Sequence, residues 1–142
     1  MDPNVRPARP SDSDTIYRFI CELATYEREP DAVEVTSAIL REQLESDNPP
    51  FECLIAETIE GEALGFALFF TNYSTWRGRP GIYLEDLYVP EPLRGRGIGL
   101  KLLKHLARVA VERNCARLEW AVLNWNQPAI DFYRSVGATP MS

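Results

Sequence analysis

The chain has 142 residues, of which 45% are hydrophobic and 25% are charged, and its formal net charge is −6 at pH 7. These values are typical of an ordinary globular protein, here a single domain over residues 1–142 with one real core. The negative charge argues against nucleic acid as a partner. The longest apolar run, residues 63–70 (ALGFALFF), is too short to cross a membrane.

The cysteines indicate a reducing environment. Cys21, Cys53 and Cys115 are odd in number and widely spaced, so they predict neither a disulfide framework nor a zinc site. The first residues also lack the apolar segment of a signal peptide. We therefore expect a cytoplasmic protein that holds no metal.

The first half of the chain reads as two helices followed by a hairpin. A helix is predicted over residues 11–27, because apolar side chains recur at the spacing of one helix face. The members of this face are Ile16, Phe19, Ile20 and Leu23. A second helix begins at Thr36 or Ser37. Residues 51–58 and 63–71 then form two strands of a β-hairpin.

The second half alternates strands with helices. A polar loop is predicted at residues 73–81, and a strand at residues 82–89. A helix follows the glycine-rich stretch 93–99 (LRGRGIG), and residues 117–123 form another strand. The last helix begins at Asn126. The result is a mixed α/β fold in which the last two of these strands run parallel.

The glycine-rich stretch leads from a strand into a helix. Its bare backbone N–H groups and the helix dipole suit an oxyanion, above all a pyrophosphate. The P-loop pattern is absent. The spacing of Gly95, Gly97 and Gly99 is one residue short of the dinucleotide-binding fingerprint, so Glu119, 20 residues further on, is not taken for a ribose ligand. A tight strand-to-helix turn without a ligand is the alternative.

The surroundings of this stretch decide between those alternatives. Arg94, Gly97 and Gly99, after residues 84–89 (LEDLYV), resemble the acetyl-CoA signature of the GNAT superfamily of N-acetyltransferases. The likeness is strongest to the polyamine acetyltransferases, especially the thialysine N-acetyltransferases. It extends over residues 73–79 (YSTWRGR), 121–127 (AVLNWNQ) and 131–134 (DFYR). It implies the GNAT fold, whose two central strands splay apart around acetyl-CoA.

The resemblance also implies the residues that hold acetyl-CoA. Backbone groups of Leu87 and Val89 would bond the pantetheine, and the N–H groups of residues 95–99 would hold the pyrophosphate. Asn126 would meet the cofactor, although a plain helix cap is an equal alternative. The full set is Leu87, Tyr88, Val89, Arg94, Gly95, Arg96, Gly97, Ile98, Gly99, Asn126 and Ala129.

Two residues carry the chemistry that the resemblance implies. Tyr133 would be the general acid that protonates the leaving thiolate, the alternative being a second core aromatic. Glu85 would anchor the substrate ammonium or accept its proton, the alternative being a salt bridge at the strand edge. Glu85 and Asp86 lie among apolar residues, so we expect both to be buried, with Asp86 in a structural role.

The substrate expected from the resemblance is a small cationic amine: thialysine, a lysine-like amine or a polyamine. Its predicted contacts are Tyr26, Glu27, Trp76, Glu85, Glu119 and Trp120. The acidic first half of the chain, with 15 acids and 5 arginines in residues 1–62, favours a cation. The amine would attack the thioester directly in a ternary complex. A protein or peptide amine acetyltransferase and a non-catalytic CoA-binding regulator are the alternatives.

One feature departs from the resemblance. The family continues past the Gly137-Ala138 motif into a final strand, and this chain ends at Ser142. We therefore expect that strand to be missing here, which would expose a sheet edge. Family members are commonly dimers with C-terminal strands near the interface, so we expect a homodimer.

Overall fold

The computed structural model describes residues 3–120. Their strands form one sheet, in which each strand lies beside the next one along the chain. The strands are β1 (Asn4–Pro7), β2 (Glu52–Glu57), β3 (Ala63–Ser74), β4 (Arg79–Tyr88) and β5 (Leu118–Trp120). The first four pair antiparallel, and β5 pairs parallel to β4. The predicted mixed sheet and its parallel pair are confirmed.

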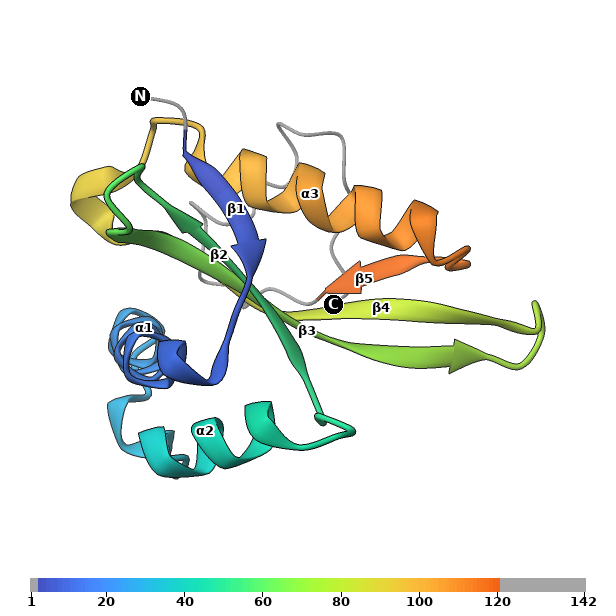
Figure 1. Ribbon diagram of the computed structural model, residues 1–142, viewed down its shortest axis with the longest axis horizontal. Helices are drawn as coiled ribbons and strands as arrows, with labels where there is room; N and C mark the ends of the chain where they lie inside the picture. Colours follow the sequence, from blue (N-terminus) through green and yellow to red (C-terminus); the bar gives the residue numbers. More distant parts are fainter. Residues whose placement is uncertain (1–2, 121–142) are drawn as a thin grey trace.

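Helices cover both faces of this sheet. Helix α3 (Ile98–Glu112) lies on one face, and α1 (Ser13–Tyr26) and α2 (Ser37–Glu45) lie on the other (Figure 1). The buried side chains form two clusters, one against α3 and one against α1 and α2. The central strands are therefore apolar on both faces, which explains why β2 and β3 read as continuous apolar runs.

Alternate residues of β2 supply the two clusters. Leu54 and Ala56 point toward α3, whereas Cys53 and Ile55 point toward α1 and α2. All four side chains are buried. This alternation is the period of two that an extended strand imposes.

The structure differs from the expectations at two places, and a third part of the expectations is not tested. Strand β1 was not predicted, because it is a four-residue edge strand that ends in a proline. The expected loop at 73–81 is wrong at both ends, because β3 runs to Ser74 and β4 begins at Arg79, and these two residues pair. The predicted helix after Asn126 and residues 121–123 of the last predicted strand lie outside the described residues.

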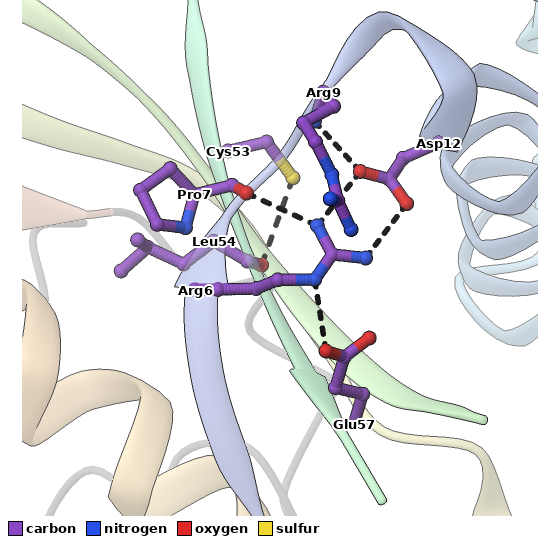
Figure 2. Close-up of polar contacts among 7 residues, drawn as sticks. All are labelled: Arg6, Pro7, Arg9, Asp12, Cys53, Leu54 and Glu57. Carbon is purple, nitrogen blue, oxygen red and sulfur yellow. Dashed lines mark hydrogen bonds and ion pairs between the residues drawn. The ribbon is translucent and has the colours of Figure 1, made fainter. Parts of the chain in front are cut away.

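A network around Arg6 joins β1 to the start of α1 (Figure 2). The Arg6 guanidinium donates two hydrogen bonds of 2.9 Å to the carboxylate of Asp12, and its Nε lies 3.0 Å from Glu57 Oε1 on β2. The Asp12 carboxylate also accepts from the backbone N–H of Arg9 at 2.6 Å. Arg6 therefore fixes the chain segment that leads into α1, the helix whose far end reaches the candidate site.

Two further findings concern the described part of the chain. No helix within residues 3–120 is long and apolar enough to span a membrane. The three cysteines are free thiols, as the sequence predicts.

Candidate active site

Strand β4 carries an irregularity at Glu85. Across β3 and β4, Leu68 pairs with Asp86 and Phe69 pairs with Leu84, so Glu85 has no partner residue on β3. One extra residue on one strand is a β-bulge, which bends the strand and changes the direction of its side chains. The side chain of Glu85 therefore does not follow the regular alternation of its neighbours on β4.

The bulge gathers three carboxylates with the end of α1. Glu27, the residue at the C-terminal end of α1, lies near Glu85 and Asp86, and we call these three residues the acidic group. Burial and, after it, the charges of Glu85 and Glu27 together raise the pKa of Asp86 to about 7. Burial, followed by the charge of Glu85, also raises the pKa of Glu27. Carboxylates whose charges raise one another's pKa favour a cation nearby.

The expected burial of both strand acids is wrong for one of them. Glu85 is exposed, whereas Asp86 is partly buried. The bulge is the reason, since it directs the extra residue outward while its neighbour Asp86 returns to the pairing register. The buried acid is therefore the one for which the sequence predicted a structural role.

The glycine-rich turn has the backbone geometry that an anion site needs. Gly95 and Gly97 adopt left-handed conformations with φ of 82° and 81°, and Gly97 is the residue that precedes the first turn of α3. A Cβ atom at either glycine would meet nothing within 4 Å, so the backbone is open on that side. Within residues 3–120, no hydrogen bond engages the N–H groups of residues 95–99. Such free donors at a helix start fit a pyrophosphate.

Arg94 joins this turn to α1. Its Nε donates to the carbonyl of Val89 at 2.8 Å. Its guanidinium carbon lies 4.6 Å from the centroid of the Tyr26 ring and 5.9 Å from that of Tyr88. An open groove of about 660 Å³ runs between α1 and the turn, and Tyr26, Tyr88 and Arg94 form part of its wall.

The Tyr88 ring is itself tied to α1. Its hydroxyl donates to Glu22 Oε1 at 2.7 Å, and its ring packs 5.7 Å from that of Phe19. Burial and this hydrogen bond raise the pKa of Tyr88 to about 12. The hydrogen bond and the ring packing of Tyr88 are made with α1, and its guanidinium contact is made with Arg94; the predicted role of Tyr88 in binding acetyl-CoA stays a prediction.

Other predicted substrate residues lie away from the acidic group. Glu119 on β5 forms an ion pair with Arg117 at 2.7 Å and accepts a longer hydrogen bond of 3.4 Å from Asn72. Trp120 is buried in the cluster beneath α3. Trp76 is 98% exposed in the turn of the β3–β4 hairpin, which extends away from α1 and α2 (Figure 1). Within the described residues, these three side chains do not join Glu27 and Asp86, and their substrate roles stay predictions.

Several predicted residues cannot be placed. Asn126, Ala129 and Tyr133 lie outside the described residues, as does any separation of the two central strands beyond Trp120. Within residues 3–120, no group of three or more His, Cys, Asp or Glu side chains is arranged to hold a metal ion.

Comparison with known proteins decides the family. The model of the acetyltransferase (GNAT) family matches residues 14–138. The chain belongs to this family. It is therefore an acetyltransferase, and GNAT acetyltransferases take the acetyl group from acetyl-CoA. The resemblance drawn from the glycine-rich stretch and its flanks is confirmed.

Individual relatives agree with this assignment. The thialysine N-epsilon-acetyltransferase of Bos taurus is 41% identical over 145 residues, which cover 97% of this chain and 85% of the relative. Spermidine/spermine N(1)-acetyltransferase-like protein 1 of Homo sapiens is 39% identical over 97% of this chain, which spans 21% of that protein. A solved aminoglycoside acetyltransferase from a soil metagenome has a TM-score of 0.81 at 19% identity, covering 99% of this chain and 90% of that one. That last likeness concerns the fold alone.

Proposed function

We propose that this acetyltransferase transfers the acetyl group of acetyl-CoA to a primary amine of a small cationic substrate. The observation that carries the proposal is the acidic group, in which Glu27, directly after α1, lies close enough to Glu85 and Asp86 of β4 for its charge to act on Asp86 and that of Glu85 to act on it. Thialysine, lysine-like amines and polyamines are the candidate substrates. Relatives whose names include thialysine and spermidine support this class.

The acidic group would hold the substrate by charge. An ammonium placed among the three carboxylates relieves their repulsion and lowers the pKa of Asp86 toward its ordinary value. Glu85, which is exposed at the bulge, either anchors the reacting ammonium or accepts its proton. Glu27, at the end of α1, would hold the distal charge of the substrate.

The glycine turn would hold the co-substrate. The N–H groups of residues 95–99 would bond the pyrophosphate, because they have no hydrogen-bond partner within the described residues and the backbone is open on the Cβ side of Gly95 and Gly97. The backbone of Leu87 and Val89 would bond the pantetheine along the end of β4. Tyr133 would donate a proton to the departing thiolate, so that the amine attacks the thioester directly.

Location and assembly complete the proposal. The three free thiols are consistent with a cytoplasmic protein. A homodimer is proposed as well, and the exposed Tyr73 and Trp76 of the β3–β4 hairpin give it apolar surface to bury. Light scattering at micromolar concentration tests the dimer.

The test of the function is an acetyl-CoA assay on a panel of amines. The panel contains thialysine, lysine, ornithine, spermidine and cadaverine, with pentylamine as the match to cadaverine that lacks the second charge. We expect kcat/KM to be at least about tenfold higher for cadaverine than for pentylamine, because the distal ammonium meets the acidic group. Equal values would contradict the proposed charge recognition.

The same assay separates the alternatives. A protein or peptide amine acetyltransferase would prefer peptides with a free amine to all members of the panel. A non-catalytic regulator would bind acetyl-CoA and acetylate none of the amines or peptides. Tyr133→Phe should lower kcat by about 10²-fold or more if Tyr133 is the general acid, and unchanged kcat at the pH optimum would exclude that role.

A further inference from the structure

The side chain of Arg94 contacts both the end of β4 and the last residue of α1. Its Nε donates to the carbonyl of Val89 at 2.8 Å, which fixes the base of the side chain at the end of β4. Its guanidinium then lies over Tyr26, 4.6 Å from the ring centroid. This distance is within the range of a cation–π contact. The side chain therefore spans the distance from the glycine turn to the last residue of α1.

Both rings that face Arg94 belong to the α1 side of the site. Tyr26 is the last residue of α1, and the next residue is Glu27 of the acidic group. Tyr88, whose ring lies 5.9 Å from the guanidinium, is hydrogen-bonded to Glu22, one helical turn before Tyr26. A shift of the Arg94 side chain would therefore change the packing at the C-terminal end of α1.

A second arginine in the same turn provides a contrast. Arg96 lies two residues further along, and both arginines are exposed. It makes no hydrogen bond, ion pair or ring contact with any residue from 3 to 120. The two arginines therefore differ in their contacts and not in their exposure, although both belong to the glycine-rich stretch.

The geometry points to Arg94 as a positioning residue that couples the acetyl-CoA turn to the amine-binding end of α1 through the ring of Tyr26. The amine half of this inference rests on the proposed function. The side chain acts by holding two elements together, whereas Arg96 acts only on the phosphate side. Because a coupling between two sites is reciprocal, a change at Tyr26 alters acetyl-CoA binding and a change at Arg94 alters amine binding.

A double-mutant cycle between Tyr26 and Arg94 tests this coupling. Tyr26→Leu, Arg94→Gln and the double variant are compared for the Kd of acetyl-CoA, by calorimetry, and for the KM of the amine. In either single variant, we expect loss of the contact to raise the Kd of acetyl-CoA and the KM of the amine by about 2- to 5-fold. Either single substitution removes the contact between Arg94 and Tyr26. The effect of the double variant on each constant should therefore be smaller than the product of the two single effects.

Three variants serve as matched controls. Arg96→Gln should weaken acetyl-CoA binding only, and its effect should multiply with that of Tyr26→Leu. Tyr26→Phe keeps the aromatic ring that the Arg94 guanidinium contacts. In the Tyr26→Phe background, Arg94→Gln should therefore have the same effect on Kd and KM as in the wild type, even if Tyr26→Phe changes turnover. Arg94→Lys keeps the charge but lacks the planar fork that bonds Val89 and stacks on the ring together, so it should recover part of the coupling.

The outcomes separate this inference from the proposed function. Effects of Tyr26→Leu and Arg94→Gln that multiply fully in both constants would overturn the inference while leaving the amine activity in place. If the wild-type protein acetylates no amine, the proposed function fails, and the acetyl-CoA cycle alone decides the coupling. Should Arg94→Gln not fold, as judged by thermal unfolding, the cycle with Arg94→Lys decides it.

Discussion

Leu84 and Tyr88 lie four residues apart on β4 and pack on opposite faces of the sheet. Leu84 belongs to the cluster beneath α3, whereas Tyr88 packs against Phe19 of α1. In a regular strand, residues four apart share a face. The extra residue at Glu85 reverses the alternation between them, so the bulge that shapes the acidic group also determines how the end of β4 is packed.

This relationship predicts that the presence of residue 85 matters more to folding than its side chain. Deleting Glu85 would exchange the faces of all residues that follow it on β4, moving Asp86 into an apolar core and Leu87 out of it. We expect the deletion to cost more than about 4 kcal/mol and to abolish cooperative unfolding in urea. Glu85→Ala, the matched control, should change stability by less than about 0.5 kcal/mol, because the side chain is exposed. A deletion variant as stable as Glu85→Ala would contradict the assigned register.

The partly buried carboxyl of Asp86 predicts a pH dependence of stability. Its pKa is raised from 3.8 to about 7, first by burial and then by Glu85 and Glu27. The folded state therefore holds a proton that the unfolded state has released, and this contribution to stability is lost as the pH rises from about 4 through 7. Asp86→Asn removes the dependence, so the variant should gain roughly 2–3 kcal/mol relative to wild type between pH 5 and pH 8.

The measurement is the free energy of unfolding in urea at pH 5, 6, 7 and 8 for both proteins. Glu27→Gln is the control, because Glu27 contributes less to the raised pKa of Asp86 than burial and Glu85 do. Between pH 5 and pH 8, the free energy of unfolding of Glu27→Gln should fall by most of the amount by which that of the wild type falls. A difference between wild type and Asp86→Asn that stays constant from pH 5 to pH 8 would exclude the raised pKa.

The elements that the sequence predicted are those with a strong local pattern. The face of α1 repeats at the helical spacing from Ile16 to Leu23, and Thr36 accepts a hydrogen bond from the Ile39 N–H as a helix cap does. The glycine turn was recognised from the glycines themselves, and the left-handed backbone at Gly95 and Gly97 gives a physical reason for glycine at those two positions. In each case, a few adjacent residues contain the physical cause.

The features that were missed depend on residues far apart in the chain. Nothing in residues 84–89 indicates a bulge, since the extra residue appears only in the pairing of β4 with β3. The sequence therefore expected Glu85 to be buried, whereas it is exposed. The contact between Arg94 and Tyr26 joins elements 68 positions apart, and only the packed fold brings them together.

The open backbone at Gly97 predicts that charge, more than size, controls acetyl-CoA binding. Gly97→Ala introduces strain at a φ of 81° and should cost roughly 1–2 kcal/mol of stability without a clash. Gly97→Gln adds bulk at the turn, and Gly97→Glu adds nearly the same bulk with a negative charge facing the pyrophosphate. We expect the Kd of acetyl-CoA to rise at least about tenfold further for Glu than for Gln. Calorimetry at two salt concentrations measures it, and equal Kd values for the two variants would place the pyrophosphate elsewhere.

The ion pairs of Arg6 and Arg113 predict that replacing each arginine by methionine lowers the free energy of unfolding by different amounts. The side chains of Arg6, Asp12 and Glu57 are 19%, 13% and 16% exposed, whereas those of Arg113 and Glu52 are 43% and 42% exposed. Arg6→Met leaves two largely buried carboxylates without their partner and should cost about 2–3 kcal/mol. Arg113→Met, the control, should cost less than about 1 kcal/mol, although its shortest N···O distance is only 2.6 Å.

The effect of Arg6→Met should also depend on pH. The Arg6 hydrogen bonds hold the pKa of Asp12 below its ordinary value of 3.8. The stability that this pair contributes is therefore present above that pH and is lost as the pH falls through the lower pKa of the folded state. The difference between wild type and Arg6→Met in the free energy of unfolding should shrink in acid, whereas the small Arg113→Met difference has no such link to Asp12. A cost for Arg6→Met that matches that of Arg113→Met at neutral pH would show that the network does not hold β1 against α1.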